Sequence, residues 1–122
     1  MPEKVNLKEK LSGFDELWSP KVVAELNGQY VKVVKCLGKY VWHHHENEDE
    51  MFLVIDGELE LHFRDKVIEL SPGELCVIPK GVEHKPVAKE LCQIALFEPS
   101  ATRNTGNVDH KYTLEADELE RI

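Results

Sequence analysis

The chain has 122 residues, of which 42% are hydrophobic and 31% are charged, and its formal net charge at pH 7 is -8. This length suits one domain, and the apolar fraction is high enough for a packed core, which excludes an intrinsically disordered chain. The acidic balance argues against nucleic acid and against an anionic membrane surface as partners.

The cysteines and the amino-terminal composition indicate a reducing compartment. Cys36, Cys76 and Cys92 form no Cys-x-x-Cys pair, and an odd number of cysteines would leave a free thiol in a secreted protein. The first residues are charged and lack the apolar stretch of a signal peptide, and the apolar runs elsewhere are too short for a transmembrane helix. We therefore expect a cytoplasmic protein without a signal peptide or a transmembrane helix.

The first predicted element is a short helix over residues 7–11. Asn6 is a favourable N-cap residue, and Gly13 follows the end of the helical pattern. Residues 1–20, which include this helix, are expected to form an extension that packs on the following domain.

Short β-strands separated by turn residues are predicted from Lys21 onward. Asn27-Gly28 and Asp56-Gly57 are strong signals for tight turns because these residue types tolerate positive φ. The predicted strands cover residues 22–26, 29–37, 41–45, 50–55, 58–63, 67–70, 75–78, 83–87 and 91–97. Many short strands with turns roughly every 8–12 residues favour an all-β antiparallel sandwich or barrel, which we assign to residues 21–98.

The remaining residues, 99–122, are expected to form a carboxy-terminal tail on the barrel surface. Its first part, to His110, is rich in Thr, Asn, Gly and Ser. Residues 114–119 are predicted to form a helical turn or two.

The most informative feature is the cluster His43-His44-His45. Side chains on a strand alternate between its two faces, so His43 and His45 share a face and His44 lies on the other. Residues two apart lie about 6.5–7 Å apart along a strand, which is close enough for two imidazoles to reach one ion. The alternative in which His44 replaces one of its neighbours in the metal shell is kept open.

Glu50 and His84 extend this cluster. Glu50 shares its face with Phe52 and Val54, so its carboxylate enters an apolar interior, where it is costly unless it is paired or bound to a metal. His84 follows the turn Pro79-Lys80-Gly81, which can direct it into the same interior. Three histidines and one carboxylate suit Zn, Mn, Fe, Co or Ni better than Ca or Mg.

These residues resemble the two sequence motifs of the cupin superfamily. The first motif, Gly, His-x-His, Glu and Gly, is matched by Gly38, His43, His45, Glu50 and Gly57. The second motif, Gly, Pro-x-Gly and His, is matched by Gly73, Pro79, Gly81 and His84. Two departures are present, since Gly38 precedes His43 by one residue fewer than in the family and the final Asn of the second motif is replaced by Ala88.

The resemblance implies a single antiparallel double-stranded β-helix, the jelly-roll or cupin barrel, with a short amino-terminal helical segment. It also implies one divalent transition metal, with ligands His43, His45, Glu50 and His84. Sugar isomerases, epimerases, decarboxylases and dioxygenases are among the implied relatives, and no motif selects between them.

Two functions of different classes follow. The first is a small metalloenzyme that acts on a sugar or small carbonyl metabolite bound in the barrel, by isomerase, epimerase or dioxygenase chemistry. The second is a non-catalytic module that binds a small molecule or a metal. A storage or structural role with a vestigial site is disfavoured by the intact ligand set.

The other notable side chains are given structural interpretations. His62 is expected on the outer face of its strand, and no role is assigned to His110. Met51, Leu53 and Ile55 form an apolar row on the face of their strand opposite Glu50. Either residues 1–18 or a second subunit must cover this row, and we expect a homodimer.

Overall fold

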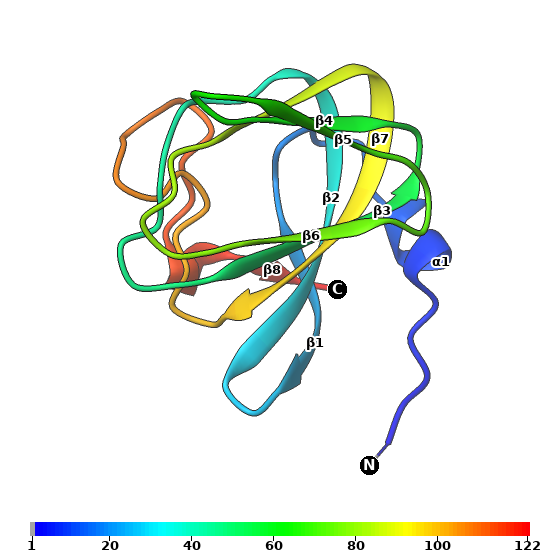
Figure 1. The fold of residues 1–122 in the computed structure, drawn as a ribbon. Helices are drawn as coiled ribbons and strands as arrows, with labels where there is room; N and C mark the ends of the chain where they lie inside the picture. Colours follow the sequence, from blue (N-terminus) through cyan, green and yellow to red (C-terminus); the bar gives the residue numbers. More distant parts are fainter. Residues whose placement is uncertain (1) are drawn as a thin grey trace.

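The computed structural model describes residues 2–122, which fold into β-strands around a common interior, with a short helix at one side (Figure 1). The strands are β1 (Lys21–Leu26), β2 (Gln29–Lys39), β3 (Glu50–Asp56), β4 (Leu59–His62), β5 (Val67–Leu70), β6 (Leu75–Ile78), β7 (Lys85–Pro99) and β8 (Glu120–Arg121). The helical elements are α1 (Leu7–Leu11) and a short 3-10 helix (Ala116–Glu118). The predicted all-β jelly-roll barrel with a short amino-terminal helix is confirmed.

Strand β7 organises the barrel because it pairs in turn with β4, β2 and β3. The strand order is β5-β4-β7-β2-β1-β8, and β3 joins this sheet through β7 while also pairing with β6. These pairs are antiparallel except for β1 with β8, which is parallel. The register places the start of β3 beside the end of β7, and the candidate site lies there.

The hairpin between β1 and β2 is confirmed, with Asn27 at φ 50° and Gly28 at φ 76° in its turn. The strands at residues 67–70 and 75–78 are confirmed with the predicted bounds.

Two strand predictions were wrong. Residues 41–45 are not a strand, and an isolated bridge links His43 to His84 there. The strands predicted separately at 83–87 and 91–97 are joined from Lys85 onward in the continuous β7. Residues 88–90 contain no Gly or Pro. The strand therefore continues without a break from the part that pairs with β4 to the part that pairs with β3.

Helix α1 is confirmed, with the Asn6 side chain accepting a hydrogen bond from the Glu9 backbone N–H at 3.0 Å. It is followed along the chain by Phe14, which packs with Leu11 and Val33 in a small apolar cluster outside the barrel, against which Ile55 also packs. The amino-terminal segment therefore covers part of the apolar outer row of β3. The helical turn predicted at 114–119 is the 3-10 helix. Among residues 2–122, neither helical element has the length and hydropathy needed to cross a bilayer.

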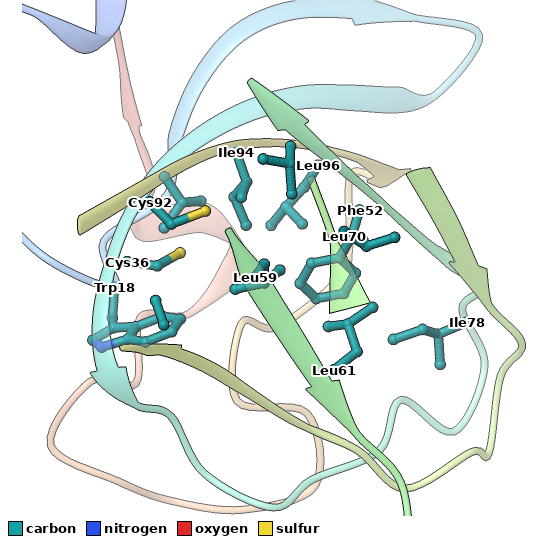
Figure 2. Close-up of a cluster of buried hydrophobic side chains, with 13 residues drawn as sticks. Trp18, Cys36, Phe52, Leu59, Leu61, Leu70, Ile78, Cys92, Ile94 and Leu96 are labelled. Atoms are coloured by element: carbon teal, nitrogen blue, oxygen red, sulfur yellow. The ribbon is translucent and has the colours of Figure 1, made fainter. Parts of the chain in front are cut away.

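The main core fills the barrel interior, as Figure 2 shows. The predicted face of β3 is confirmed, since Glu50, Phe52 and Val54 are buried while the residues between them are less so. The core is built from the inward side chains of several strands together with Trp18 from the amino-terminal extension. Its fully or almost fully buried members are Trp18, Val34, Cys36, Phe52, Val54, Leu59, Leu61, Leu70, Ile78, Ala88, Cys92, Ile94 and Leu96.

Candidate metal centre

The four candidate ligands come together at one end of the barrel interior. One potential ligand atom from each lies within 4.8 Å of the others, and all four residues are buried: His43, His45, Glu50 and His84. Glu50 is the first residue of β3, and His84 immediately precedes β7. The two remaining histidines lie on the connection between β2 and β3.

Backbone hydrogen bonds connect the two histidine segments. The His43 N–H donates to the His84 carbonyl at 3.0 Å, and the His84 N–H donates to the His43 carbonyl at 2.9 Å. The Gly81 N–H also donates to the His45 carbonyl, at 2.8 Å. These bonds bring the two histidine segments together although they are distant in the sequence.

Two of the imidazoles are held in a single tautomer. His43 Nδ1 lies 2.8 Å from the Val41 carbonyl, and His84 Nδ1 lies 2.9 Å from the Val82 carbonyl. A carbonyl oxygen accepts but cannot donate, so each Nδ1 carries the proton and each Nε2 keeps a free lone pair. In metal sites, a hydrogen bond of this kind from the nitrogen that does not bind the metal orients the histidine ligand.

The spacing of the remaining atoms fits one ion. Glu50 Oε1 lies 3.4 Å from His45 Nε2 and 3.3 Å from His84 Nε2, longer than usual N–H···O hydrogen bonds. These three atoms are buried and have no hydrogen-bond partner within residues 2–122. Two atoms each about 2.1 Å from one ion, in adjacent positions, are about 3.0–3.5 Å apart. The donor set and its spacing therefore suit a transition-metal ion.

The electrostatics of the cluster favour the protonation states that a metal needs. Burial, together with the neighbouring His84, lowers the pKa of His43 to about 4, so its imidazole is neutral at pH 7. Burial acts to raise the pKa of Glu50, but its contacts with Glu98, His45 and His84 outweigh burial and hold that pKa well below its usual value. The site thus presents a neutral imidazole beside a charged carboxylate.

A small cavity of about 30 Å³ adjoins the cluster. Its lining is mainly apolar, with Tyr40 and Asn104 as polar members beside His43 and Glu50. The ring of Tyr40 stands edge-on to His43, with ring centres 5.5 Å apart. Trp18, which also lines the cavity, has a φ of 56° that is uncommon for a bulky residue, and its indole N–H donates to the Leu37 carbonyl at 3.0 Å.

Residues 99–115, here called the strap, lie against the ligand segment. The Asn107 N–H donates to the His44 carbonyl at 3.1 Å, and the His44 N–H donates to Asn107 Oδ1 at 2.9 Å. A Cβ added to Gly106 would lie 2.1 Å from the His44 carbonyl oxygen, so the close approach requires glycine. The strap therefore attaches to the residue between two candidate ligands.

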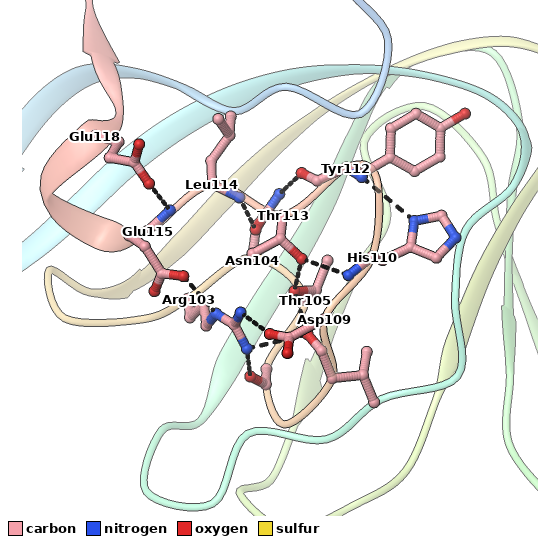
Figure 3. Close-up of polar contacts among 12 residues, drawn as sticks. Arg103, Asn104, Thr105, Asp109, His110, Tyr112, Thr113, Leu114, Glu115 and Glu118 are labelled. Carbon is pink, nitrogen blue, oxygen red and sulfur yellow. Dashed lines mark hydrogen bonds and ion pairs between the residues drawn. The ribbon is translucent and has the colours of Figure 1, made fainter.

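The strap also has an internal network of polar contacts, which Figure 3 shows. The Asn104 amide donates to the Tyr112 carbonyl at 2.8 Å, and its Oδ1 accepts from the Leu114 N–H at 2.9 Å. The Tyr112 ring stacks on Tyr40 with ring centres 5.9 Å apart. This network fixes Asn104, which lines the cavity, and Tyr112, which stacks on the lining residue Tyr40.

The histidines expected to lie outside the cluster do so. His44 Nε2 contacts Glu46 at 2.8 Å, and His62 Nε2 contacts Glu60 at 2.8 Å. His110 lies in the strap, where its Nδ1 accepts from the Tyr112 N–H at 3.3 Å.

The sequence analysis missed the buried ion pair of Lys32 and Glu98, whose side chains lie 2.8 Å apart. Lys32 has the same strand parity as Val34 and Cys36, which are buried, and this parity was the available signal for an inward lysine. The strap residues near His44 carried no comparable signal, because their contacts are distant in the sequence.

Comparisons with known proteins agree with this architecture. The Cupin domain family model matches residues 37–92. A cupin-2 domain containing protein from Shewanella frigidimarina is 52% identical, with a TM-score of 0.77 over 78% of this chain and 93% of that one. Protein NMB1881 from Neisseria meningitidis is 33% identical, with a TM-score of 0.74 over 80% of this chain and 99% of that one.

A curated relative, the uncharacterized protein YdbB of Bacillus subtilis (strain 168), is 36% identical over 80 residues. The match spans 65% of this chain and 65% of the length of that relative.

Proposed function

The chain belongs to the cupin superfamily, and on this premise we propose that it binds one divalent transition metal through His43, His45, Glu50 and His84 and uses it to act on a small oxygen-containing metabolite. The observation that carries the proposal is the convergence of buried donor atoms that lack other hydrogen-bond partners in the described chain. The donor set admits Zn, Mn, Fe, Ni or Co, among which cellular availability often decides.

The charge balance indicates the class of ligand. A divalent ion bound by neutral imidazoles and the Glu50 carboxylate keeps one net positive charge, which favours an anionic or strongly polar oxygen ligand. The metal would supply Lewis-acid or redox chemistry to that oxygen. Tyr40 and Asn104 provide polar groups for orientation, while the apolar cavity wall limits access of water. These features support a sugar or small carbonyl metabolite and chemistry of the isomerase, epimerase or dioxygenase type.

The cavity limits the size of the reacting group. Its volume of about 30 Å³ holds only one or two water molecules, so only the end of a metabolite fits beside the cluster.

Elemental analysis of protein purified without an affinity tag tests metal binding. We expect close to one transition-metal ion per chain, and we expect His45→Ala and His84→Ala to lose it. His62→Ala is the matched control, because this histidine contacts Glu60 away from the cluster, and it should keep the metal. Stoichiometric metal in both ligand variants would overturn the assignment.

Turnover is tested separately from binding. Wild-type protein loaded with each candidate metal is incubated with a panel of sugar phosphates and diketones, and we expect metal-dependent conversion of a member of the panel. A compound that raises the melting temperature without being converted would instead support the non-catalytic binding module.

We also propose that the protein is a cytoplasmic homodimer. Cys36, Cys76 and Cys92 are free thiols, as expected in a reducing compartment. On the outer face, Leu75 and Val77 are each 54% exposed, and β6 pairs with the strand that carries the apolar outer row. Such a patch suits an isologous interface. Light scattering coupled to size exclusion should give twice the chain mass, and a monomer would contradict the proposal.

A further inference from the structure

Glu98 on β7 lies across from the candidate ligand Glu50 on β3. The β3–β7 ladder pairs Met51 with Phe97 and Phe52 with Leu96, so the next pair in this antiparallel register is Glu50 with Glu98. Directly opposed side chains have Cβ atoms about 4.5–5.5 Å apart. Since Glu50 is 3% exposed and Glu98 is 1% exposed, the two carboxyl groups face each other with little solvent to screen them.

Lys32 on β2 supplies the opposite charge. Its Nζ lies 2.8 Å from Glu98 Oε1, and its side chain is fully buried. The other oxygen of this carboxyl group, Glu98 Oε2, is buried and has no hydrogen-bond partner in the part of the chain that the structure describes. The three side chains therefore form a buried row, Lys32–Glu98–Glu50, that ends at the candidate metal position.

Fold stability alone does not explain this row. Replacing a buried ion pair by apolar residues of similar volume is often neutral or stabilising. The neighbouring inward positions of β7, Ile94 and Leu96, are apolar, so this strand accommodates such residues. The free-energy cost of burying these charged groups, which occurs at the end of the barrel with the candidate ligands, therefore suggests a role at the metal site.

We infer that the Lys32–Glu98 pair positions Glu50, holding its carboxylate in the orientation that binds the metal. The inference rests on the proposed metal site. Lys32 fixes Oε1 of Glu98, the Glu98 side chain faces Glu50 in the β3–β7 register, and Oε1 of Glu50 remains directed at His45 and His84. Glu98 and Lys32 are thus positioning residues that act through Glu50.

The test is the double variant Lys32→Met/Glu98→Leu, which removes the pair without leaving a lone buried charge. The dissociation constants of Zn²⁺ and Co²⁺ are measured by competition with a chromophoric chelator, and the visible spectrum of the Co²⁺ form is recorded. We expect affinity to fall by roughly 10–100-fold, as for other outer-shell changes, and the Co²⁺ bands to shift. The single variant Glu98→Gln, whose amide can contact both Lys32 and Glu50, should keep most of the wild-type affinity for the metal.

Lys21→Met is the matched control, because Lys21 is also a buried lysine of this sheet and forms ion pairs with Glu16 and Glu120. It should leave the affinity and the Co²⁺ spectrum unchanged. If this double variant does not fold, Lys32→Leu/Glu98→Met replaces it, since this second apolar pair also leaves no lone buried charge.

The outcomes separate the two proposals. Wild-type affinity and an unchanged Co²⁺ spectrum in either folded double variant would overturn the positioning role while the metal site stands. A wild-type protein that binds neither Zn²⁺ nor Co²⁺ would overturn the metal site and the positioning role together.

Discussion

The two ends of the barrel interior differ in chemistry although the same strands build both. On β2, β3 and β7, the inward row begins with a charged residue at the metal end and continues with apolar residues. These rows are Lys32, Val34 and Cys36; Glu50, Phe52 and Val54; and Glu98, Leu96 and Ile94. In each row, a single charged residue thus lies at the candidate metal site, and the residues that follow it belong to the packed core.

The two ends contribute differently to the stability of the fold. Burial of apolar side chains such as Leu59 and Leu61 is favourable, whereas buried charges are costly unless they are paired. The apolar end therefore supplies the stability, and the polar end depends on its bridge between His43 and His84, on Lys32 and on the strap. Disturbing one end should leave a different signature from disturbing the other.

The largest expected effect is on stability and comes from the apolar end. Leu61→Ala removes a fully buried side chain, and such changes cost about 2–5 kcal/mol of unfolding free energy. Urea unfolding measures the loss, and elemental analysis should still find one metal per chain in the folded fraction. Loss of metal from folded Leu61→Ala would show that the two ends are not independent.

Two glycines provide a matched pair of close approaches. A Cβ at Gly57 would lie 2.7 Å from the Leu91 carbonyl oxygen, and one at Gly106 would lie 2.1 Å from that of His44, both at positive φ. Backbone strain alone should cost each alanine variant about 1–3 kcal/mol. Gly106→Ala should also weaken metal binding, because it displaces the strap from the ligand segment, whereas Gly57→Ala should not. Equal metal affinities of the two variants, measured by chelator competition, would show that the strap does not support the metal site.

Removing the metal should destabilise the protein by mass action. At a free metal concentration of about 100 times the dissociation constant, binding contributes about 2.7 kcal/mol. Chelation should therefore lower the melting temperature of wild-type protein by about 10 °C. The ligand variant His84→Ala should melt at the same temperature with and without chelator, and an equal shift in this variant would point to metal bound elsewhere.

The smallest effect is the pH dependence of the metal-free protein. The pKa of His43 falls from 6.5 to about 4 on folding, so the unfolded chain binds more protons between these values and stability declines as pH falls through this range. Between pH 7.5 and 5.5 the expected loss is about 1–2 kcal/mol. Urea unfolding measures it, and His43→Gln should flatten the profile. An equal decline in that variant would assign the effect to other groups.

Local patterns in the sequence predicted much of the site. The alternation along β3 placed Glu50 inward with Phe52 and Val54, because a strand with one buried face has its register set by its apolar residues. The strand predicted at 41–45 was wrong, since this segment gains its backbone partner from His84, far away in the sequence.

Other parts of the site depend on long-range pairing. The facing of Glu98 and Glu50 follows from the register of β7 against β3, and no turn or motif signals that register locally. The contact between Gly106 and His44 is likewise made only when the strap lies on the barrel.

Anomalous diffraction from crystals of untagged protein would locate the metal ion directly. Data collected on both sides of the absorption edge of the metal found by elemental analysis should give one strong peak per chain. We expect this peak about 2.0–2.3 Å from nitrogen atoms of His43, His45 and His84 and from an oxygen of Glu50. A peak at another position, or no peak among these four side chains, would contradict this expectation.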